Sequence, residues 1–169
     1  FSDFSPSFGN GEYSEIYFTS SRNGGFSNKI DDRTGETFTD LYSSKLNKKG
    51  KWSVPEMLPE PINTEGNEGS VALNKRGTTM YFTKCEVKKK KALGCSIYVS
   101  NRKGKIWGPP TLLQIKVDSN TTLGHPTINE DESILIFSSD LSGGYGGKDL
   151  WIVKQQNRGK WSIPVNLGP

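Results

Sequence analysis

The chain has one histidine, two cysteines and two methionines among its 169 residues, and only 32% of the residues are hydrophobic. No apolar run approaches the roughly 20 residues that a membrane-spanning helix requires. The sequence therefore predicts no direct membrane insertion by this segment. No charged-then-apolar signal segment opens the chain, and its first residue is Phe1 rather than methionine. We expect it to be part of a longer protein.

Residue types that usually act in catalysis or bind metals are also scarce or scattered. A Ser–His–Asp or Cys–His arrangement would have to form around His125, the single histidine. His, Cys and carboxylate residues do not cluster at metal-ligand spacing. We therefore expect no catalytic residues, no metal and no cofactor. A glycoside hydrolase stays open as an alternative, since it needs two converging carboxylates, and the candidates are Glu68, Glu130, Asp131 and Asp140.

Basic residues outnumber acidic ones by 22 to 18, which gives a formal net charge of +4. Much of the excess lies in one run, Lys88-Lys89-Lys90-Lys91. Such a run either steers anionic partners or is a solvated hairpin tip that keeps a sheet edge soluble, and we favour the second interpretation. Nucleic acid is not expected as a partner, because the run lacks the interleaved aromatic or arginine residues that such binding uses.

The chain is rich in glycine (19) and proline (9), and it contains an internal repeat. The repeat is clearest in Gly-Lys-Trp-Ser-Val-Pro at 50–55, Gly-Lys-Ile-Trp-Gly-Pro at 104–109 and Gly-Lys-Trp-Ser-Ile-Pro at 159–164. The tryptophans of these segments, Trp52, Trp107 and Trp161, are 55 and 54 residues apart. A period of this length indicates a propeller or a solenoid.

Each repeat contains signals for four short strands. First strands are predicted at 6–8, 71–73 and 126–128, second strands at 15–20, 80–83 and 134–139, third strands at 40–42, 96–99 and 149–153, and a short fourth strand such as 111–114. Four antiparallel strands in about 50 residues is the pattern of a β-propeller blade. We predict an all-β, β-propeller fold with three four-stranded antiparallel blades, at approximately 4–62, 68–117 and 123–169, within a larger propeller of about six blades.

The recurring residues have structural interpretations. Trp52, Trp107 and Trp161 are each expected to pack between neighbouring blades and to give the indole N–H a partner. Asp40 and Asp149 precede third strands, where a short carboxylate accepts backbone N–H groups at a turn. His125, in Gly124-His125-Pro126, is expected to bond within its own blade.

These motifs resemble a known repeat family. Residues 5–8 with the Gly-Asn-Gly turn, and then Ile16-Tyr17-Phe18-Thr19-Ser20-Ser21-Arg22-Asn23-Gly24-Gly25, resemble the WD40-like, TolB-type repeat called PD40. The segments 138–151 and 58–68 are similar to the Bacteroidetes version, in which such repeats precede an OmpA-like peptidoglycan-binding domain in outer-membrane lipoproteins. The resemblance covers the whole chain. Blade two departs from it, because Cys85-Glu86-Val87-Lys88 onward replaces the Gly-Gly loop.

The resemblance implies a periplasmic, outer-membrane-associated protein. We expect a non-catalytic scaffold that binds other cell-envelope proteins, as part of a secretion-system or outer-membrane/peptidoglycan-linked assembly, with peptidoglycan reached through a neighbouring domain. A carbohydrate- or peptidoglycan-binding module with exposed Tyr and Trp is the alternative, and a propeller glycoside hydrolase is the third possibility. The sequence does not identify the binding surface. We expect further blades beyond Pro169.

Cys85 and Cys95 are predicted to form a disulfide. Aligning blade two on blade three puts Cys85 at the end of the second strand and Cys95 just before the third. Opposed positions of an antiparallel pair have Cα atoms about 4.5–5.5 Å apart, which is within disulfide reach. The bond would close a Lys-rich loop from Glu86 to Gly94, and an oxidising compartment would preserve it. Two free, partly buried thiols are the alternative.

Overall fold

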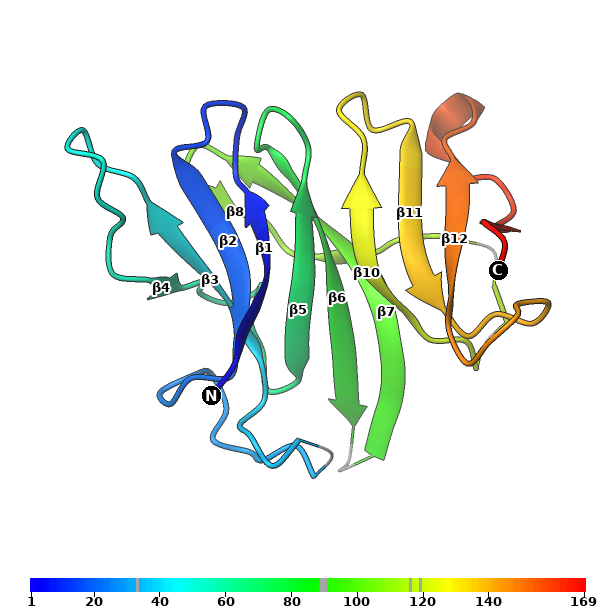
Figure 1. The fold of residues 1–169 in the computed structure, drawn as a ribbon, viewed down its shortest axis with the longest axis horizontal. Helices are drawn as coiled ribbons and strands as arrows, with labels where there is room; N and C mark the ends of the chain where they lie inside the picture. Colours follow the sequence, from blue (N-terminus) through cyan, green and yellow to red (C-terminus); the bar gives the residue numbers. More distant parts are fainter. Residues whose placement is uncertain (33, 89–90, 116, 119) are drawn as a thin grey trace.

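The computed structural model describes the backbone of residues 1–32, 34–88, 91–115, 117–118 and 120–169, with their side chains except at 87–93 and 158. Over these residues the chain folds into three antiparallel sheets that stand side by side (Figure 1). Lys89 and Lys90, two of the four lysines in the basic run, lie outside the described residues. No helix in the described part of the chain is both long and apolar enough to cross a membrane.

We call the three sheets blades one, two and three. Blade one comprises β1 (Asp3–Phe8), β2 (Glu15–Ser20), β3 (Asp40–Lys45) and β4 (Glu56–Met57). Blade two comprises β5 (Asn67–Leu73), β6 (Thr79–Lys88), β7 (Lys91–Lys103), β8 (Ile106–Trp107) and β9 (Thr111–Leu112). Blade three comprises β10 (Leu123–Ile128), β11 (Ile134–Ser139), β12 (Asp149–Lys154) and β13 (Val165–Asn166), with a 3₁₀ turn, η1 (Asn157–Gly159).

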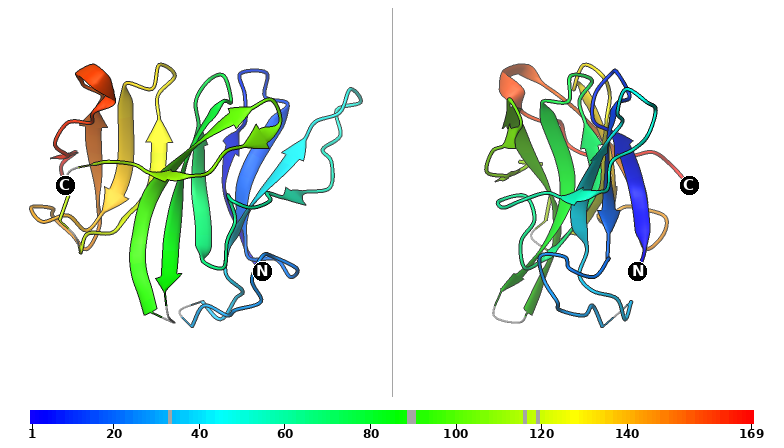
Figure 2. Two further views of the ribbon diagram at one scale, coloured as in Figure 1. Left: turned by 180° about the vertical axis from the view of Figure 1, so that it is seen from behind. Right: turned by 90° about the vertical axis from the view of Figure 1, so that its left-hand side faces the viewer.

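The first strands of the three blades are neighbours, with β5 between β1 and β10 (Figures 1 and 2). The short turns that follow them lie at the upper edge in Figure 1, which we call the turn edge. The opposite, lower edge holds the connections between second and third strands and the links between blades. We call it the loop edge and define it by the described residues within the ranges 21–39, 58–66, 84–96, 113–122 and 140–148.

Two hydrophobic clusters hold the blades together. The first cluster joins blade one to blade two and includes the buried side chains Tyr17, Leu41, Leu58, Ile62, Val71, Met80, Phe82 and Trp107. The second joins blade two to blade three and includes Tyr81, Ile97, Leu123, Leu135, Phe137, Trp151 and Val153. All of these residues except Leu58 and Ile62 lie in strands, and β11 alternates partly buried and buried positions along its whole length. Each blade is therefore stabilised by its neighbours.

Asparagine side chains close the first turn of each blade. Asn74 Oδ1 accepts the N–H groups of Thr78 (2.8 Å) and Thr79 (3.1 Å). Asn10 and Asn129 act in the same way in blades one and three. Asparagine is well suited to this role because its side chain bonds to backbone a few residues further on.

The first strands begin earlier than the sequence predicts. Pairing was expected from residues 6, 71 and 126, but it starts near residues 3, 67 and 123 and continues through a bulge. Each bulge contains a residue with positive φ: Ser5 (51°), Ser70 (48°) and His125 (53°). Non-glycine residues seldom adopt this conformation. Because the bulge interrupts the alternation of side chains along the strand, the sequence pattern does not reveal the residues that pair before it.

The segment around the repeated tryptophan is a small outer hairpin. In blade two, β8 pairs with the end of β7, and β9 returns to pair with Tyr98 and Val99. In blade one Trp52 forms an isolated β-bridge with Leu46, and in blade three Trp161 forms one with Gln155. The predicted fourth strand at 111–114 is the two-residue β9.

Candidate binding surfaces

The three repeated tryptophans have different environments. Trp107 is 7% exposed and lies edge-on to Tyr17 of blade one, with the ring centroids 6.0 Å apart. The Arg102 guanidinium lies 5.1 Å from the centroid of the Trp107 ring. Trp161 is partly buried against the second cluster. Trp52 differs from the prediction, since it is 43% exposed. Trp107 of blade two packs on blade one. In this structure no blade lies on the side of blade one where Trp52 would make the equivalent contact.

Asp40 and Asp149 each hold a loop of the loop edge. Asp40 Oδ2 accepts the N–H of Phe26 at 2.8 Å, and Asp149 Oδ2 accepts the N–H groups of Tyr145 (2.9 Å) and Gly146 (3.2 Å). This is the contact that the sequence predicts for them. Burial raises the pKa of Asp40 to about 6, and the Phe26 amide opposes that rise. Asp40 is therefore a buried carboxylate with a structural partner.

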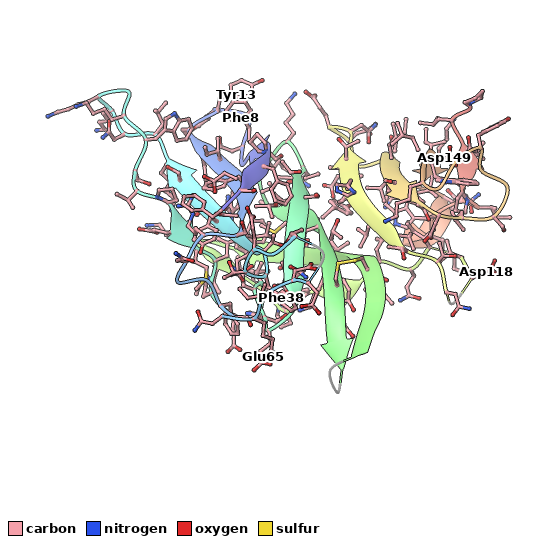
Figure 3. All side chains as sticks on the ribbon, turned by 60° about the horizontal axis from the view of Figure 1, so that its bottom comes forward. Phe8, Tyr13, Phe38, Glu65, Asp118 and Asp149 are labelled. Atoms are coloured by element: carbon pink, nitrogen blue, oxygen red, sulfur yellow. A yellow bond between two sulfur atoms is a disulfide. The ribbon has the colours of Figure 1, made fainter. Side chains whose placement is uncertain are left out.

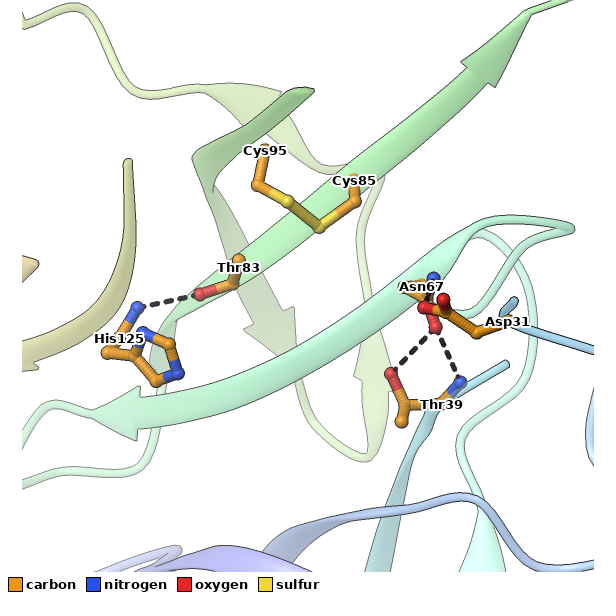
Figure 4. Close-up of a disulfide and its surroundings, with 7 residues drawn as sticks. All are labelled: Asp31, Thr39, Asn67, Thr83, Cys85, Cys95 and His125. Carbon is orange, nitrogen blue, oxygen red and sulfur yellow. Dashed lines mark hydrogen bonds between the residues drawn. A yellow bond between two sulfur atoms is a disulfide. The ribbon is translucent and has the colours of Figure 1, made fainter. Parts of the chain in front are cut away.

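His125 does not bond within its own blade as expected. Its side chain is exposed, and its backbone N–H donates to Thr83 Oγ1 of blade two at 2.9 Å (Figure 4). Ser70 makes the same contact one blade earlier, donating its N–H to Thr19 Oγ1 at 2.9 Å. The bulge turns the N–H of His125 away from its own sheet. The backbone of His125, rather than its side chain, therefore links blade three to blade two.

Cys85 and Cys95 are joined by a disulfide, with their Cα atoms 4.0 Å apart (Figure 4). They face each other in the β6–β7 ladder. The expectation of a loop from Glu86 to Gly94 is wrong, because pairing continues past the cysteines to Lys88 and Lys91. Blade two therefore has a long hairpin at the loop edge where blades one and three have Asp-bound loops (Figure 1). Its position equivalent to Asp40 and Asp149 is Ser96, opposite Lys84.

The loop edge carries a cavity of about 420 Å³ between blades one and two. It is lined by Ser2, Phe4, Ser21, Asp31, Thr34, Glu36, Thr37, Thr39 and Asn67. Asn67 Oδ1 accepts both the N–H (2.9 Å) and the hydroxyl (3.2 Å) of Thr39, and Asn67 Nδ2 donates to Asp31 at 3.5 Å (Figure 4). Hydrogen bonds from Ser21 and Ser2 lower the pKa of Glu36. The cavity presents hydroxyls, amide and carboxylate groups beside one aromatic ring.

Contacts between loops fix the shape of the loop edge. Lys29 Nζ lies 2.7 Å from Glu65 Oε2, which ties the loop at 21–39 to the link between blades. Within that link, Asn63 bonds Leu41 through both backbone groups, at 2.8 and 2.9 Å. Figure 3 shows Phe38 and Glu65 together at this edge, far from Phe8 and Tyr13 at the turn edge. Sequence reasoning missed Asn63 and Asn67, although both belong to the 58–68 segment that resembles the repeat family.

A second, smaller groove of about 290 Å³ runs across the first strands of the three blades. It brings together the three positive-φ residues, and the hydroxyl oxygens of Ser5 and Ser70 are 3.4 Å apart. Pro6, Val71 and Pro126 add apolar surface. The groove therefore combines the hydroxyl groups of serine and threonine residues and the side chain of His125 with this apolar surface.

The four carboxylates considered for glycoside hydrolysis do not converge. Glu130 and Asp131 lie in the turn before β11, and Asp140 follows the other end of that strand. Six residues of strand separate them by about 20 Å, well beyond the distance over which two carboxyl groups share a glycosidic bond. Glu68 is fully buried and accepts the N–H (3.0 Å) and hydroxyl (2.5 Å) of Thr64.

The remaining partners of these carboxylates are structural. Burial raises the pKa of Glu68, while the Thr64 hydrogen bonds oppose the rise. Glu130 pairs with Lys75 at 2.7 Å, and Asp140 accepts the N–H of Thr122 at 2.7 Å. Within the described residues, no three His, Cys, Asp or Glu side chains are arranged to hold a metal ion.

No protein-family model and no curated protein matches the sequence. Solved structures do match the fold. The chain is similar to TolB from Acinetobacter baumannii, with a TM-score of 0.56 and 15% identity over 96% of this chain and 32% of TolB. It is also similar to an α-L-arabinofuranosidase from Lactobacillus brevis (TM-score 0.50, 12% identity, 92% of this chain and 50% of that one).

A thermostable family-43 glycoside hydrolase matches with a TM-score of 0.50 and 15% identity, over 99% of this chain and 58% of the hydrolase. In each case this chain spans less than two thirds of the other protein. At these identities the likeness shows the fold alone. Together with the sheet topology it establishes three antiparallel blades of a β-propeller, as the repeat predicts. Blades one and three have four strands, and blade two has five because β8 and β9 both pair with β7.

Proposed function

We propose that this chain is a non-catalytic propeller scaffold that binds another protein through its loop edge. The observation that carries the proposal is the construction of that edge, where three different connections are each held by a specific bond: Asp40 to Phe26, the disulfide, and Asp149 to Tyr145. Ordered loops on a rigid scaffold suit recognition because little entropy is lost on binding.

The proposed setting is the periplasmic side of the outer membrane. The support is the resemblance of the repeat to PD40 segments of peptidoglycan-associated lipoproteins, together with the disulfide, which an oxidising compartment preserves. The individual protein that the repeat most resembles is PorE, the peptidoglycan-linked component of the type IX secretion system. The partners proposed are therefore other cell-envelope proteins, with peptidoglycan reached through a neighbouring domain.

Glycan binding is the second candidate function. The cavity at the loop edge supports it, because hydroxyl, amide and carboxylate groups beside Phe4 are the groups that recognise sugars. A propeller glycoside hydrolase is the weakest candidate. Two of the similar structures are glycoside hydrolases, but Glu130 and Asp131 lie at the opposite edge from Asp140, and each has a structural partner.

The test is capture from an envelope extract by wild type and two matched variants. Tyr145→Ala changes the loop edge and Tyr13→Ala the turn edge, and both tyrosines are well exposed. Capture of a defined protein, lost in the first variant and retained in the second with unchanged circular dichroism, is expected. Sedimentation with peptidoglycan instead would favour the glycan module, and polysaccharide turnover lost in Glu130→Gln would favour the hydrolase.

A further inference from the structure

The outer hairpins of the three blades are strongly basic. They comprise residues 45–54, 101–110 and 154–164, and together they contain ten of the 22 basic residues of the chain and no aspartate or glutamate. The rest of the chain has 12 basic and 18 acidic residues and is therefore net negative. The positive charge of the protein is thus concentrated on these three hairpins.

All three outer hairpins reach the turn edge (Figures 1 and 2). They do so because each of them follows a third strand, and in an antiparallel blade the third strand ends at the same edge as the first. Blade three has η1 at this tip, at the upper right in Figure 1, and the hairpin of blade one is at the upper left. The three basic hairpins therefore face the same side of the molecule.

Lysines of the outer hairpins are available to an outside partner. Lys51, Lys105 and Lys160 are exposed, one on each hairpin, and none of them forms an ion pair with a described residue. Lys75, on the turn after the first strand of blade two, differs because it pairs with Glu130 at 2.7 Å. The charge of the outer hairpins is therefore not neutralised within the chain at these positions.

Three acidic residues of the turn edge lie on the turn after the first strand of blade three, and each has a partner there. Glu130 pairs with Lys75, and Glu132 accepts the side-chain amide of Asn74 at 2.7 Å. Asp131 accepts a backbone N–H of its own turn at 3.0 Å. These carboxylates therefore hold the turns of blades two and three and do not pair with the outer hairpins.

Each outer hairpin also exposes an apolar side chain. Val54 is 83% exposed, Ile106 76% and Ile163 69%. Val54 and Ile163 occupy equivalent positions, because the serine before each of them donates its N–H to the end of the third strand, at 2.8 and 2.9 Å. Blade two has a blade on either side, so the exposure of Ile106 is not caused by a missing neighbour. Basic and apolar side chains therefore occur together on all three hairpins.

We propose that the turn edge docks on an anionic lipid bilayer through the three outer hairpins. The lysine ammonium groups meet lipid phosphates, and Val54, Ile106 and Ile163 enter the headgroup region. The contact is peripheral and places no strand in the hydrocarbon. It leaves the opposite loop edge open to a protein partner, and it does not depend on the function proposed for that edge.

The combination of side chains favours a bilayer over the other occupants of a basic surface. Lysines that only keep a hairpin tip soluble need no exposed valine or isoleucine beside them. Nucleic acid is recognised by stacking bases on aromatic rings, and Val54, Ile106 and Ile163 are aliphatic. A bilayer surface uses both kinds of side chain at once, since phosphate attracts lysine and the acyl boundary accepts aliphatic groups.

Co-sedimentation with vesicles tests the charged part of the contact. The vesicles contain three parts phosphatidylcholine and one part phosphatidylglycerol, and vesicles of phosphatidylcholine alone are the neutral control. Wild type is expected to bind the anionic vesicles at least about tenfold more tightly than the neutral ones. Lys51→Gln with Lys160→Gln is expected to weaken binding at least about tenfold. Lys29→Gln with Lys148→Gln removes the same charge from exposed positions of the loop edge and is expected to change binding less than about twofold.

A second pair of variants tests the apolar part. Val54→Ser with Ile163→Ser keeps the net charge and is expected to weaken binding to the anionic vesicles at least about fivefold. Both side chains are exposed, so circular dichroism is expected to be unchanged. Ile30→Ser is the control, because Ile30 is 54% exposed at the loop edge, and it is expected to bind as wild type does.

Equal losses from the two lysine pairs would overturn the proposal, since net charge alone would then drive adsorption. So would full binding by the Val54→Ser, Ile163→Ser variant, because no side chain would then enter the bilayer. Absence of wild-type binding to the anionic vesicles at about 0.1 M salt would also contradict it. Binding of a single-stranded oligonucleotide in place of vesicles, lost in Lys51→Gln with Lys160→Gln, would make nucleic acid the occupant and refute the inference.

Discussion

At the scale of single residues, the buried carboxylate Asp40 is the clearest electrostatic feature of the molecule. It is 2% exposed and accepts one backbone N–H, from Phe26. Because burial raises its pKa to about 6 from 3.8, the folded state binds a proton more tightly than the unfolded chain does. The stabilising effect of protonation is fully present below about pH 4 and is lost as the pH rises through about 6.

Asp40→Asn keeps an oxygen for Phe26 and removes the charge. We expect it to raise the free energy of unfolding by about 1–2 kcal/mol at pH 7 and to leave it near the wild-type value at about pH 3, below the unfolded pKa, since two pKa units correspond to at most about 3 kcal/mol. Urea denaturation of both proteins at the two pH values measures this. Asp40→Ala, which loses the acceptor, is the control and is expected to destabilise at both. An Asn effect of equal size at about pH 3 and at pH 7 would be inconsistent with the raised pKa.

Trp107 and Trp52 occupy the same place in the repeat but differ in burial. Trp107 packs against Tyr17 across the interface of blades one and two, whereas Trp52 is 43% exposed and makes no such ring contact with the described residues. We expect Trp107→Ala to cost about 3–5 kcal/mol of stability, as for other large core truncations, and Trp52→Ala to cost at least about 2 kcal/mol less. Denaturant titration of the two variants compares them. Equal losses would show that Trp52 is covered in solution.

At the scale of elements, the long β6–β7 hairpin distinguishes blade two from blades one and three. Its third strand starts without the aspartate that holds the loops of blades one and three, and the disulfide lies in the ladder instead. A ring of this size stabilises by roughly 2–3 kcal/mol in the chain-entropy model. The bond therefore takes the place of the aspartate contact.

A thiol count on unfolded, unreduced protein tests the disulfide directly, and no free thiol is expected. Replacing both Cys85 and Cys95 by serine is expected to lower the free energy of unfolding by roughly 2–3 kcal/mol and to speed proteolysis in the hairpin. Reductant should do the same to the wild type and nothing to the double variant. Two free thiols in the native protein would refute the prediction and weaken the periplasmic proposal.

The strands of the blades could be predicted because the repeat presents each of them three times. Phe18, Phe82 and Phe137 align in the second strands, and all three are buried. The bulges could not be predicted, because positive φ is uncommon for non-glycine residues and nothing in the sequence marks it at Ser5, Ser70 or His125. The bonding of His125 was assigned to the wrong partner because the hydroxyl that accepts its N–H belongs to Thr83 of the neighbouring blade.

The environments of the candidate surface residues were harder to predict than the strands. The exposure of Trp52 depends on whether another blade packs beside it, and the sequence of a single repeat does not show this. The cavity at the loop edge joins Thr37 and Thr39 to Asn67, and these residues meet only when two blades dock. In contrast, the Asp149 contact is local to one loop, and sequence was sufficient to predict it.

At the scale of the whole molecule, the fold requires neighbouring blades to approach each other closely. Gly124 lies so near Thr83 that a Cβ would be 3.2 Å from its methyl group, whereas a Cβ on Gly146 would meet nothing nearer than 3.9 Å. We expect Gly124→Ala to destabilise by about 1–3 kcal/mol through overpacking and Gly146→Ala to have little effect. Thermal unfolding of the pair measures the difference. A neutral Gly124→Ala would mean that the blades are more loosely docked than described.

The central claim is that the loop edge of this propeller binds protein. Tyr145 on the loop edge and Tyr13 on the turn edge form a matched pair, at 69% and 63% exposed. The decisive measurement is site-specific photo-crosslinking in intact cells, with a photoreactive phenylalanine at each position in turn. We expect a protein adduct of defined mass from position 145 and none from position 13. An adduct from position 13 alone, or glycan in place of protein at position 145, would contradict it.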